Sequence, residues 1–455
     1  MGNRGLGSYR CKPVRLDGPA GERASRNRRL GRWCVASLLV ALTLSGATAQ
    51  KAATSTSLGK DVYARPALCV GQECTASVAV SAKKAKKKAA KSCASKARKH
   101  TKRCIALARK KAKAKSKSSA RAKSKSASAH PDGYGPAQLR SAYDLPAAAA
   151  HSQTIAIVTA YDAPSIEKDL GAYSKTFSLR ACTSSNGCFR KVNGAGKKAP
   201  LPQRSAIWAL ETSLDVEVAH AVCPNCKILL VEAGSSSVSN LAGAVDTAAR
   251  LGADAISNSW VVKEFRGETS YDSHFRHAGI AITAASGDTG YGANWPAASP
   301  YVTAVGGTTL DLDSSGARVR ESAWEQGSSG CSAFESKPAW QSDTGCARRT
   351  VPDVAAVANP DTGAAVYDSY GYSGRSGWFK VGGTSLATPI VAAVYALAGN
   401  AGTVVAGSYP YGHGSSLFDV TDGTNGKCSS AYLCNATTGY DGPSGLGTPI
   451  GVSGF

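Results

Sequence analysis

The alternation of apolar and polar positions predicts buried strands separated by helices over residues 150–290. Short apolar runs favour strands, and the longer stretches between them have the spacing of helices with one apolar face. Strands without a polar face indicate a mostly parallel sheet covered by helices on both sides, which is an α/β fold. The expected strands are 154–159, 227–231, 255–259 and 280–284, and the expected helices are 165–173, 205–222 and 237–251.

The first 129 residues have a different pattern. Arginines precede an apolar run at 33–44, which is followed by Ala47-Thr48-Ala49. This order is typical of a secretory signal peptide, and the run is too short to span a membrane. We therefore expect a signal peptide at 1–49, a largely disordered pro-segment or linker at 50–129, and a globular domain at 130–455. The mature protein is expected to be secreted and to have no transmembrane segment.

Charge separates the same parts of the chain. The formal charge is +23, but residues 130–455 contain 22 Lys and Arg against 27 Asp and Glu, so they carry −5 and residues 1–129 carry +28. Residues 83–125 contain twenty basic residues and no acidic one, a composition that repels itself and favours disorder. This segment is either a solvated linker or discarded pro-segment, or it contacts a polyanion such as nucleic acid, a cell-wall polymer or a membrane surface.

Cysteine spacing predicts an exported protein with local disulfides. The sequence Cys223-Pro-Asn-Cys226 also has the spacing of half a zinc site, but no second close Cys-x-x-Cys accompanies it. Twelve of the fourteen cysteines fall into six neighbouring pairs: Cys69/Cys74, Cys93/Cys104, Cys182/Cys188, Cys223/Cys226, Cys331/Cys346 and Cys428/Cys434.

A candidate nucleophile lies at Ser385. Residues 382–389 (Gly-Gly-Thr-Ser-Leu-Ala-Thr-Pro) precede an apolar run at 390–397, which predicts a tight turn leading into a helix, with Ser385 at or next to the N-cap and Pro389 in the first turn. Backbone N–H groups without helical partners then lie beside the hydroxyl, where they suit a nucleophile whose attack creates an oxyanion. An ordinary serine-capped buried helix would give the same local pattern.

Two carboxylates lie on the apolar face of the helix expected at 205–222. Glu211 and Asp215 are four residues apart, so their side chains are neighbours, while Thr212, Ser213, Glu217 and His220 lie away from the apolar arc. Burying two adjacent carboxylates raises the pKa of at least one of them, which indicates an acid/base pair. A structural ion pair could account for one of them.

Asp288 follows the strand expected at 280–284 and lies between glycines, in a turn that presents it at the carboxyl end of the strand. A plain Asx-turn is one interpretation. A protonated Asp288 that donates a hydrogen bond to an oxyanion is the other. The histidines have no motif context, so the sequence does not support a Ser-His-Asp triad.

These motifs, in this order and spacing, resemble the sedolisin family of serine-carboxyl peptidases, which are relatives of subtilisin. The resemblance implies a subtilisin-like three-layer fold with a mostly parallel sheet flanked by helices, and it identifies 130–455 as the peptidase domain. The matching motifs are Tyr134-Gly-Pro-Ala-Gln-Leu-Arg-Ser-Ala-Tyr143, Glu211-Thr-Ser-Leu-Asp-Val-Glu217, Ser257-Asn-Ser-Trp260, Ser286-Gly-Asp-Thr-Gly290, Gly383-Thr-Ser-Leu-Ala-Thr-Pro389, Gly439-Tyr-Asp441 and Gly445-Leu-Gly-Thr-Pro449.

The resemblance also implies the roles of individual residues. Ser385 is the expected nucleophile, Glu211 the general base, Asp215 its partner, and Asp288 completes the oxyanion hole with the N–H of Ser385. One structural Ca²⁺ is expected, which suits hard oxygen ligands. Its expected ligands are Asp419, the carbonyl of Val420, Asp441, and the carbonyls of Thr437 and Gly439.

The sequence departs from the family pattern at three points. Gly382 stands where the family commonly has Ser, and Thr437 where a Gly is common. Only about eighty residues separate the expected signal cleavage site from His130, whereas the family usually has a long folded pro-domain.

The resulting hypothesis is a secreted endopeptidase zymogen that hydrolyses proteins or peptides at acidic pH through an acyl-enzyme, and that is a monomer. The loops around Trp260 and Tyr291 are expected to shape its first specificity pocket. The alternatives are a tripeptidyl aminopeptidase of the same family and a catalytically inactive binding protein attached to polyanions through residues 83–125.

Overall fold

The computed structural model describes residues 62–70, 73–74 and 131–455 of the 455-residue chain. The expected signal peptide, the basic segment 83–125 and the pair Cys93/Cys104 lie outside the described residues. Residues 62–70 and 73–74 fall within the segment that is predicted to be largely disordered, and they form short strands: β1 (Arg65–Pro66), β2 (Cys69–Val70) and β3 (Glu73–Cys74).

The largest sheet of the described residues has eight strands. Its order is β12-β11-β9-β7-β4-β6-β5, with β15 pairing to β11, and only β12 runs antiparallel to its neighbour. The strands are β4 (Thr154–Ala160), β5 (Phe189–Asn193), β6 (Lys227–Ala233), β7 (Ala255–Asn258), β9 (Ala281–Ala285), β11 (Thr303–Leu312), β12 (Arg318–Ala323) and β15 (Val354–Val357). The predicted parallel sheet is confirmed, and the four predicted strands agree with β4, β6, β7 and β9 to within two residues.

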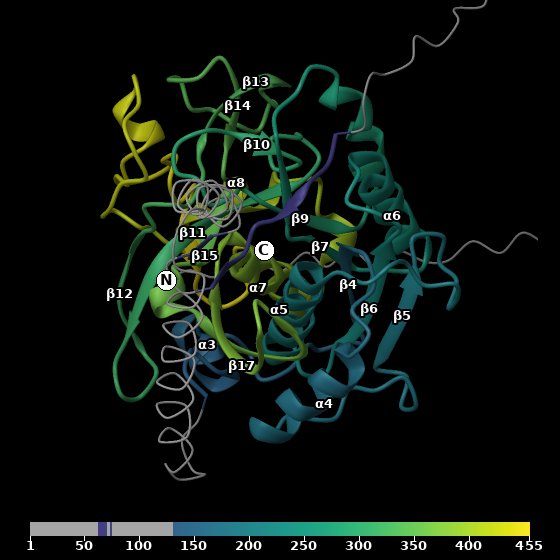
Figure 1. Ribbon diagram of the computed structural model, residues 1–455. Coiled ribbons are helices and arrows are strands. Elements are labelled where there is room, and N and C mark those ends of the chain that lie inside the picture. Colours follow the sequence, from purple (N-terminus) through teal and green to yellow (C-terminus); the bar gives the residue numbers. More distant parts are fainter. Residues whose placement is uncertain (1–61, 71–72, 75–130) are drawn as a thin grey trace, which may run out of the picture. The chain divides into compact units, whose positions relative to one another are not determined.

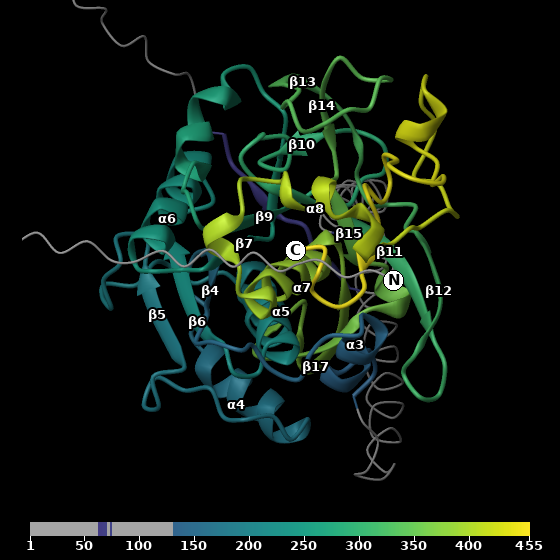
Figure 2. The same cartoon turned by 180° about the vertical axis from the view of Figure 1, so that it is seen from behind.

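Helices cover both faces of this sheet (Figures 1 and 2). Successive residues of a strand face opposite sides, so Ile155 and Ile157 of β4 pack in the core with α5 and α7, whereas Ala156 and Val158 pack in the core with α6. This gives the three layers of the predicted fold. The helices are α3 (Pro136–Ala142), α4 (Ile166–Thr176), α5 (Ala206–Val222), α6 (Val238–Arg250), α7 (Thr384–Ala398) and α8 (Tyr409–Gly412).

Short antiparallel pairs surround the main sheet. The hairpin of β16 (Ala364–Tyr372) and β17 (Arg375–Gly382) leads directly into α7. The remaining strands are β8 (Trp260–Lys263), β10 (Asn294–Trp295), β13 (Gly330–Ser336), β14 (Arg348–Val351), β18 (Leu417–Phe418) and β19 (Thr448–Pro449).

Helix α5 has no solvent face from Trp208 to Val222. It lies against α7, α4, β4 and β16, so Thr212, Ser213, Glu217 and His220 are buried although they lie away from the apolar arc. The periodicity therefore does not separate buried from exposed positions on this helix.

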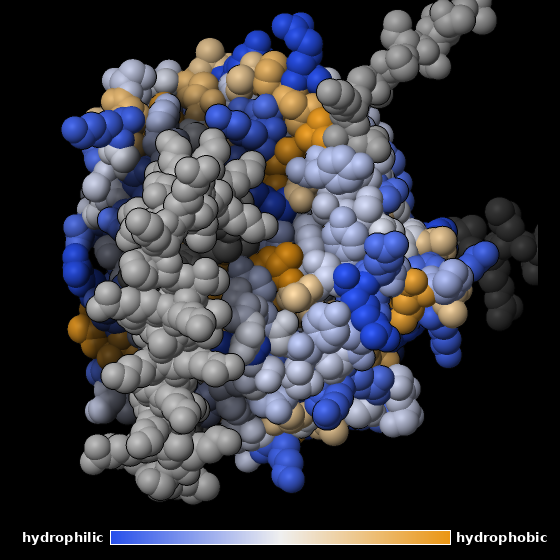
Figure 3. Space-filling view, viewed as in Figure 1, coloured by the Kyte–Doolittle hydropathy of each residue, from blue (hydrophilic) through white to orange (hydrophobic). Residues whose placement is uncertain are grey.

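Five of the six predicted cysteine pairs are disulfides in the described residues, among them Cys223–Cys226. A zinc site at that pair is thereby excluded, because both sulfurs are in a covalent bond. In the same part of the chain no helix has the length and hydropathy needed to cross a membrane. On the face shown in Figure 3, hydrophobic areas are small and separated by hydrophilic residues.

Candidate active site

The turn between β17 and α7 positions Ser385. Gly383 is the N-cap with φ of 103°, and Ser385 is the second residue of the helix, one place further in than the sequence predicts. Gly383 is required here, because a Cβ would collide with the carbonyl oxygen of Ala67 and meet Asp288 Oδ2 at 2.9 Å. Because Ser385 is in the first turn, its N–H has no acceptor within the helix and can donate to a carbonyl of another segment.

Pro389 lies inside α7 rather than in its first turn. A proline at this position leaves the carbonyl of Ser385, four residues earlier, without its helical donor. The Ser259 hydroxyl lies 3.4 Å from that carbonyl oxygen, which makes only a weak contact because the hydroxyl donates to Asp215 at 2.6 Å.

Helix α5 brings Glu211 and Asp215 to the same place. Both are fully buried. Burial raises the pKa of Glu211 well above its usual range, as does the charge of Asp215, while the nearby Ser385 hydroxyl opposes that rise. Burial also raises the pKa of Asp215, and a hydrogen bond from Ser259 lowers it. The two carboxyls therefore hold a proton between them at a pH where exposed carboxyls have lost theirs.

Ser259 connects the acidic pair to the serine. Its hydroxyl donates to Asp215 Oδ1 at 2.6 Å, and its carbonyl accepts from Ser385 Oγ at 3.2 Å. Neither carboxyl oxygen of Glu211 has a hydrogen-bond partner in this arrangement. The sequence motif Ser257-Asn-Ser-Trp260 contains Ser259, but nothing in the motif by itself assigns it this position.

Asp288 lies at the carboxyl end of β9, as the sequence predicts. Thr384, at the start of α7, holds it with two hydrogen bonds of 2.8 Å, from its N–H and its hydroxyl, both to Oδ1. Burial raises the pKa of Asp288 to about 6, against the opposing effects of Thr384 and Arg65. Below that pH the carboxyl is protonated and is able to donate a hydrogen bond from Oδ2. Thr384 is a second site residue that sequence reasoning missed.

Residues 62–70 of the same chain cover Ser385 and pair with β8 and with the end of β17 (purple in Figure 1). The N–H of Ser385 donates to the carbonyl oxygen of Ala67 at 2.9 Å, and the N–H of Ala67 donates to the carbonyl of Ser259 at 3.3 Å. Ser385, Glu211 and Asp288 are at most 2% exposed in consequence.

Three of the histidines have polar partners away from Ser385. His220 lies 2.9 Å from the carbonyl of Arg180, and both His274 and His277 contact Asp246 on α6. The carboxyl pair is thus the base candidate that the geometry supports.

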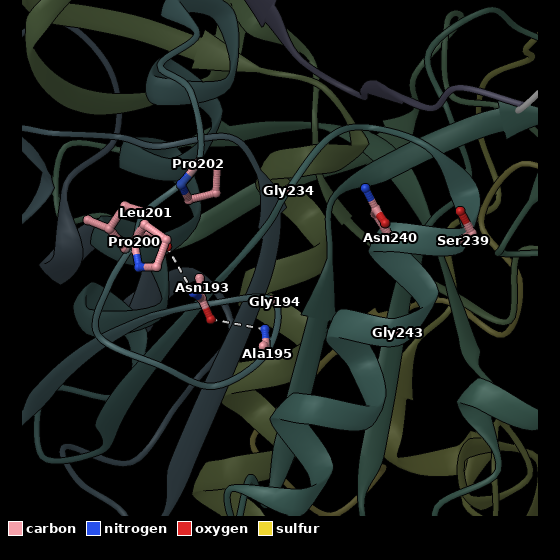
Figure 4. Close-up of a pocket in the computed structure, with 10 residues that line it drawn as sticks. All are labelled: Asn193, Gly194, Ala195, Pro200, Leu201, Pro202, Gly234, Ser239, Asn240 and Gly243. Atoms are coloured by element: carbon pink, nitrogen blue, oxygen red, sulfur yellow. Dashed lines mark hydrogen bonds between the residues drawn. The ribbon is translucent and has the colours of Figure 1, made fainter.

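Figure 4 shows a surface pocket of about 410 Å³ between the end of β5 and the start of α6. Its lining, which includes Asn193, Leu201 and Asn240, contains no ionisable side chain. This pocket is separate from the chemistry at Ser385.

Known proteins resemble this arrangement in sequence and in fold. Residues 203–403 match the model of the subtilase family. Sedolisin of Pseudomonas sp. (strain 101) is 28% identical over 368 residues, which cover 70% of this chain and 60% of sedolisin. The solved structure of Pseudomonas sedolisin, described as a serine-carboxyl proteinase complexed with two molecules of pseudo-iodotyrostatin, aligns with a TM-score of 0.60 and 26% identity, covering 71% of this chain and 96% of that one. Together these similarities in sequence and fold support the sedolisin family for this chain.

Kumamolisin of Bacillus sp. (strain MN-32), another relative, is 32% identical over 280 residues, which cover 53% of this chain and 49% of kumamolisin. The chain thus spans between about half and three fifths of the length of the sedolisin-family relatives it matches. The fold likeness to sedolisin confirms the subtilisin-like architecture that the sequence predicts.

The expected calcium residues lie together in one loop region after β18. Asp419 Oδ2 accepts from the N–H of Gly439 at 2.9 Å, and Asp441 Oδ2 accepts from the N–H of Thr437 at 2.8 Å. The carbonyl of Val420 lies nearby, 3.4 Å from the hydroxyl of Ser444. Oδ1 of Asp419 is buried without a partner, and within the described residues neither aspartate forms an ion pair. The donor set of carboxylates and carbonyls suits Ca²⁺.

Proposed function

We propose that this protein is a serine-carboxyl endopeptidase that hydrolyses peptide bonds at acidic pH. The observation that carries the proposal is that the Glu211/Asp215 pair and Asp288 lie around Ser385, whose N–H donates to a peptide carbonyl, that of Ala67. Family membership supports it, and the relative of known structure is described as a serine-carboxyl proteinase.

In the proposed mechanism Glu211 takes the proton of Ser385 Oγ as the oxygen attacks the substrate carbonyl. Asp215 keeps the proton that the pair retains, and Ser259 orients it. The N–H of Ser385 and the protonated Asp288 stabilise the oxyanion, while Glu211 passes its proton to the leaving nitrogen. Water then hydrolyses the ester on Ser385, which restores the enzyme.

The pH dependence follows from the two carboxyl sites. Asp288 has a pKa of about 6, so it loses the proton that it must donate as the pH rises above that value. For Glu211 to act as a base, the Glu211/Asp215 pair must have released one of its two protons. The pH at which it does so sets the low-pH side of the pH–rate profile. Activity is therefore bell-shaped with its maximum below pH 6.

An endopeptidase is favoured over the tripeptidyl aminopeptidase because the cleft continues beyond three residues. The carbonyl of Val62 accepts from the N–H of Val238 at 2.8 Å, and the N–H of Ala64 donates to Ser236 at 2.7 Å. An extended chain of six residues, from Val62 to Ala67, is thus bound up to the carbonyl at Ser385. A tripeptidyl peptidase would instead require a cleft that is closed after three residues.

A single calcium ion at Asp419 and Asp441, with the carbonyls of Val420, Thr437 and Gly439, is proposed as a structural element. The ion would neutralise the two carboxylates and hold the loop after β18. We also propose that the protein is exported, on the basis of the signal-like N-terminus and the disulfides.

The test is hydrolysis of an acid-unfolded protein by the secreted wild type across pH 3 to 8, beside Ser385→Ala and Glu211→Gln. Acid-optimal activity that both substitutions abolish supports the proposal. A correctly processed, calcium-loaded wild type without activity refutes it and favours the binding protein attached through 83–125. Activity that survives Glu211→Gln means that another group is the base.

A further inference from the structure

The segment of residues 62–70 lies in the cleft as an extended peptide. On one side of Ala67 it adds an antiparallel strand to β8, with Arg65 opposite Val261 and Pro66 opposite Trp260. On the other side it pairs with the end of β17, where Cys69 lies opposite Gly382 and Val70 opposite Val381. Adding a strand to an exposed edge is the usual way in which a cleft binds an unfolded peptide.

The register places one peptide bond at the nucleophile. Because the carbonyl oxygen of Ala67 accepts from the N–H of Ser385 at 2.9 Å, the carbonyl of the bond between Ala67 and Leu68 occupies the position of an oxyanion. Strand pairing on both sides holds that bond in place, which is the positioning that a reacting bond needs. Gly383 supports this reading, because its missing Cβ is what lets the Ala67 carbonyl approach.

A small pocket receives the side chain of Ala67. The residue is fully buried, and it packs with Val261 of β8 and Ala285 of β9 in a cluster of three apolar residues. The pocket wall therefore comes from Val261 and Ala285, next to the expected Trp260 loop. A larger side chain at this place would have to displace one of them.

We propose that Ser385 cleaves the bond between Ala67 and Leu68 of its own chain, and that Val261 and Ala285 restrict the residue before a cleaved bond to a small side chain. This inference rests on the proposed peptidase function, for which it names the processing site and the substrate class. Until that cleavage, the segment occupies the edges of β8 and β17 and the N–H of Ser385, to which another substrate peptide would have to bind.

The reaction needs no further reagent than water. Ser385 Oγ bonds to the carbonyl carbon of Ala67 and its proton passes to Glu211. The carbon–nitrogen bond breaks, and the nitrogen of Leu68 takes that proton and becomes a new amino terminus. Water then hydrolyses the ester, which leaves a carboxylate on Ala67 and a free hydroxyl on Ser385.

The first experiment follows the full secreted chain after a shift from pH 7.5 to pH 4, by intact mass and N-terminal sequencing. The wild type is expected to yield a chain that begins Leu68-Cys69-Val70, and Ser385→Ala is expected to keep the bond. Hydrolysis of an added unfolded protein is measured in parallel and should begin with a lag that matches this cleavage.

The outcomes separate the inference from the function. A wild type that hydrolyses the added protein while its bond between Ala67 and Leu68 stays intact overturns the inference and leaves the peptidase standing. Cleavage at this bond in Ser385→Ala also overturns it, because another protease is then responsible. If the wild type hydrolyses neither the added protein nor its own bond between Ala67 and Leu68, the proposed peptidase function is refuted.

The second experiment tests the pocket with synthetic peptides, so that no variant of the segment has to fold. The parent peptide has the sequence of residues 62–70 with Cys69→Ser, and it should be cut after the alanine. Replacing that alanine by phenylalanine should lower kcat/KM by about 10–100-fold, and the enzyme variant Val261→Ala should recover part of the loss. Replacing the tyrosine at the position of Tyr63, which is 59% exposed, is the matched control and should change little. Equal rates for the alanine and phenylalanine peptides would overturn the pocket assignment.

Discussion

The hydroxyl of Ser259 donates a 2.6 Å hydrogen bond to Oδ1 of Asp215, while the carbonyl of the same serine accepts from Ser385. Ser259 therefore contacts both the acidic pair and the nucleophile, and it is the one described residue that hydrogen-bonds to each. It therefore positions Asp215, and its hydrogen bond opposes the rise in the pKa of Asp215 that burial causes.

We expect Ser259→Ala to lower kcat more than it changes KM. The hydrogen bond to Asp215 lowers the pKa of that residue, so its loss raises the pKa and moves the acid limb of the pH–rate profile to higher pH. A hydrogen bond to a charged group contributes about 1.5–3 kcal/mol, so the rate should fall by about 10–100-fold.

Ser257→Ala is the matched control for this change, because the Ser257 hydroxyl lies buried in the same motif without a hydrogen-bond partner. It should leave the acid limb where it is. An unshifted limb in Ser259→Ala would contradict the positioning role.

Replacing Asp288 should distinguish a proton donor from a structural carboxylate. An amide in Asp288→Asn retains an oxygen that accepts from Thr384 and a nitrogen that donates at every pH. The fall in activity above pH 6 should therefore flatten in Asp288→Asn, while Asp288→Ala should lose about 10²–10³ in kcat at all pH values. Rate profiles from pH 3 to 8 measure both effects, and an Asn variant that keeps the wild-type alkaline limb would show that Asp288 does not set it.

Stability should be higher in acid than at neutral pH. Glu268, in the 3₁₀ segment Glu268–Phe275, and Glu335 on β13 lie among other carboxyls. Burial raises the pKa of Glu268 to about 9 and that of Glu335 to about 8. Because both values exceed those of the unfolded chain, the stabilisation is fully present below about pH 4.5 and is lost as the pH rises toward 8 and 9.

The check is the thermal midpoint of Ser385→Ala, which cannot digest itself, at pH 4 and pH 8. Glu268→Gln in that background should reduce the difference between the two midpoints, since an amide stays neutral at both. Glu325→Gln, at an exposed position, should not. Midpoints that rise from pH 4 to pH 8 would contradict the expected sign.

Calcium removal should destabilise the loop after β18. In Ser385→Ala, a chelator should lower the thermal midpoint, and Asp419→Asn should weaken the recovery on adding Ca²⁺. Asp422→Asn is the matched control, because Asp422 lies three residues away, pairs with Arg320 at the surface and is not an expected ligand. A thermal midpoint that the chelator does not change would refute the proposed calcium site.

Local patterns in the sequence predict much of the fold and of the site. The strands β4, β6, β7 and β9 are short apolar runs, and the pair Glu211 and Asp215 is recognisable because four residues make one turn of a helix. Asp288 could be placed at the end of its strand because glycines flank it. Each of these inferences depends only on neighbours in the sequence.

Contacts between distant segments account for what the sequence did not show. Pro389 was expected in the first helical turn, but α7 begins at Thr384, so the proline lies inside the helix. Thr384 and Ser259 are ordinary small residues until packing brings them to Asp288 and Asp215. The lysine-rich composition of 83–125 dominated the prediction for 50–129 and concealed the short apolar segment around Ala67.

The sequence by itself determined the α/β class, the family, the local disulfides and the side chains available for chemistry, because apolar spacing and residue type are local properties. Only the tertiary structure decided that a segment more than 300 residues before Ser385 lies across it with one carbonyl at its N–H. Strand pairing uses backbone groups that every residue has, so residue types do not reveal which segments pair. The pairing depends on where the folded chain leaves a strand edge without a partner.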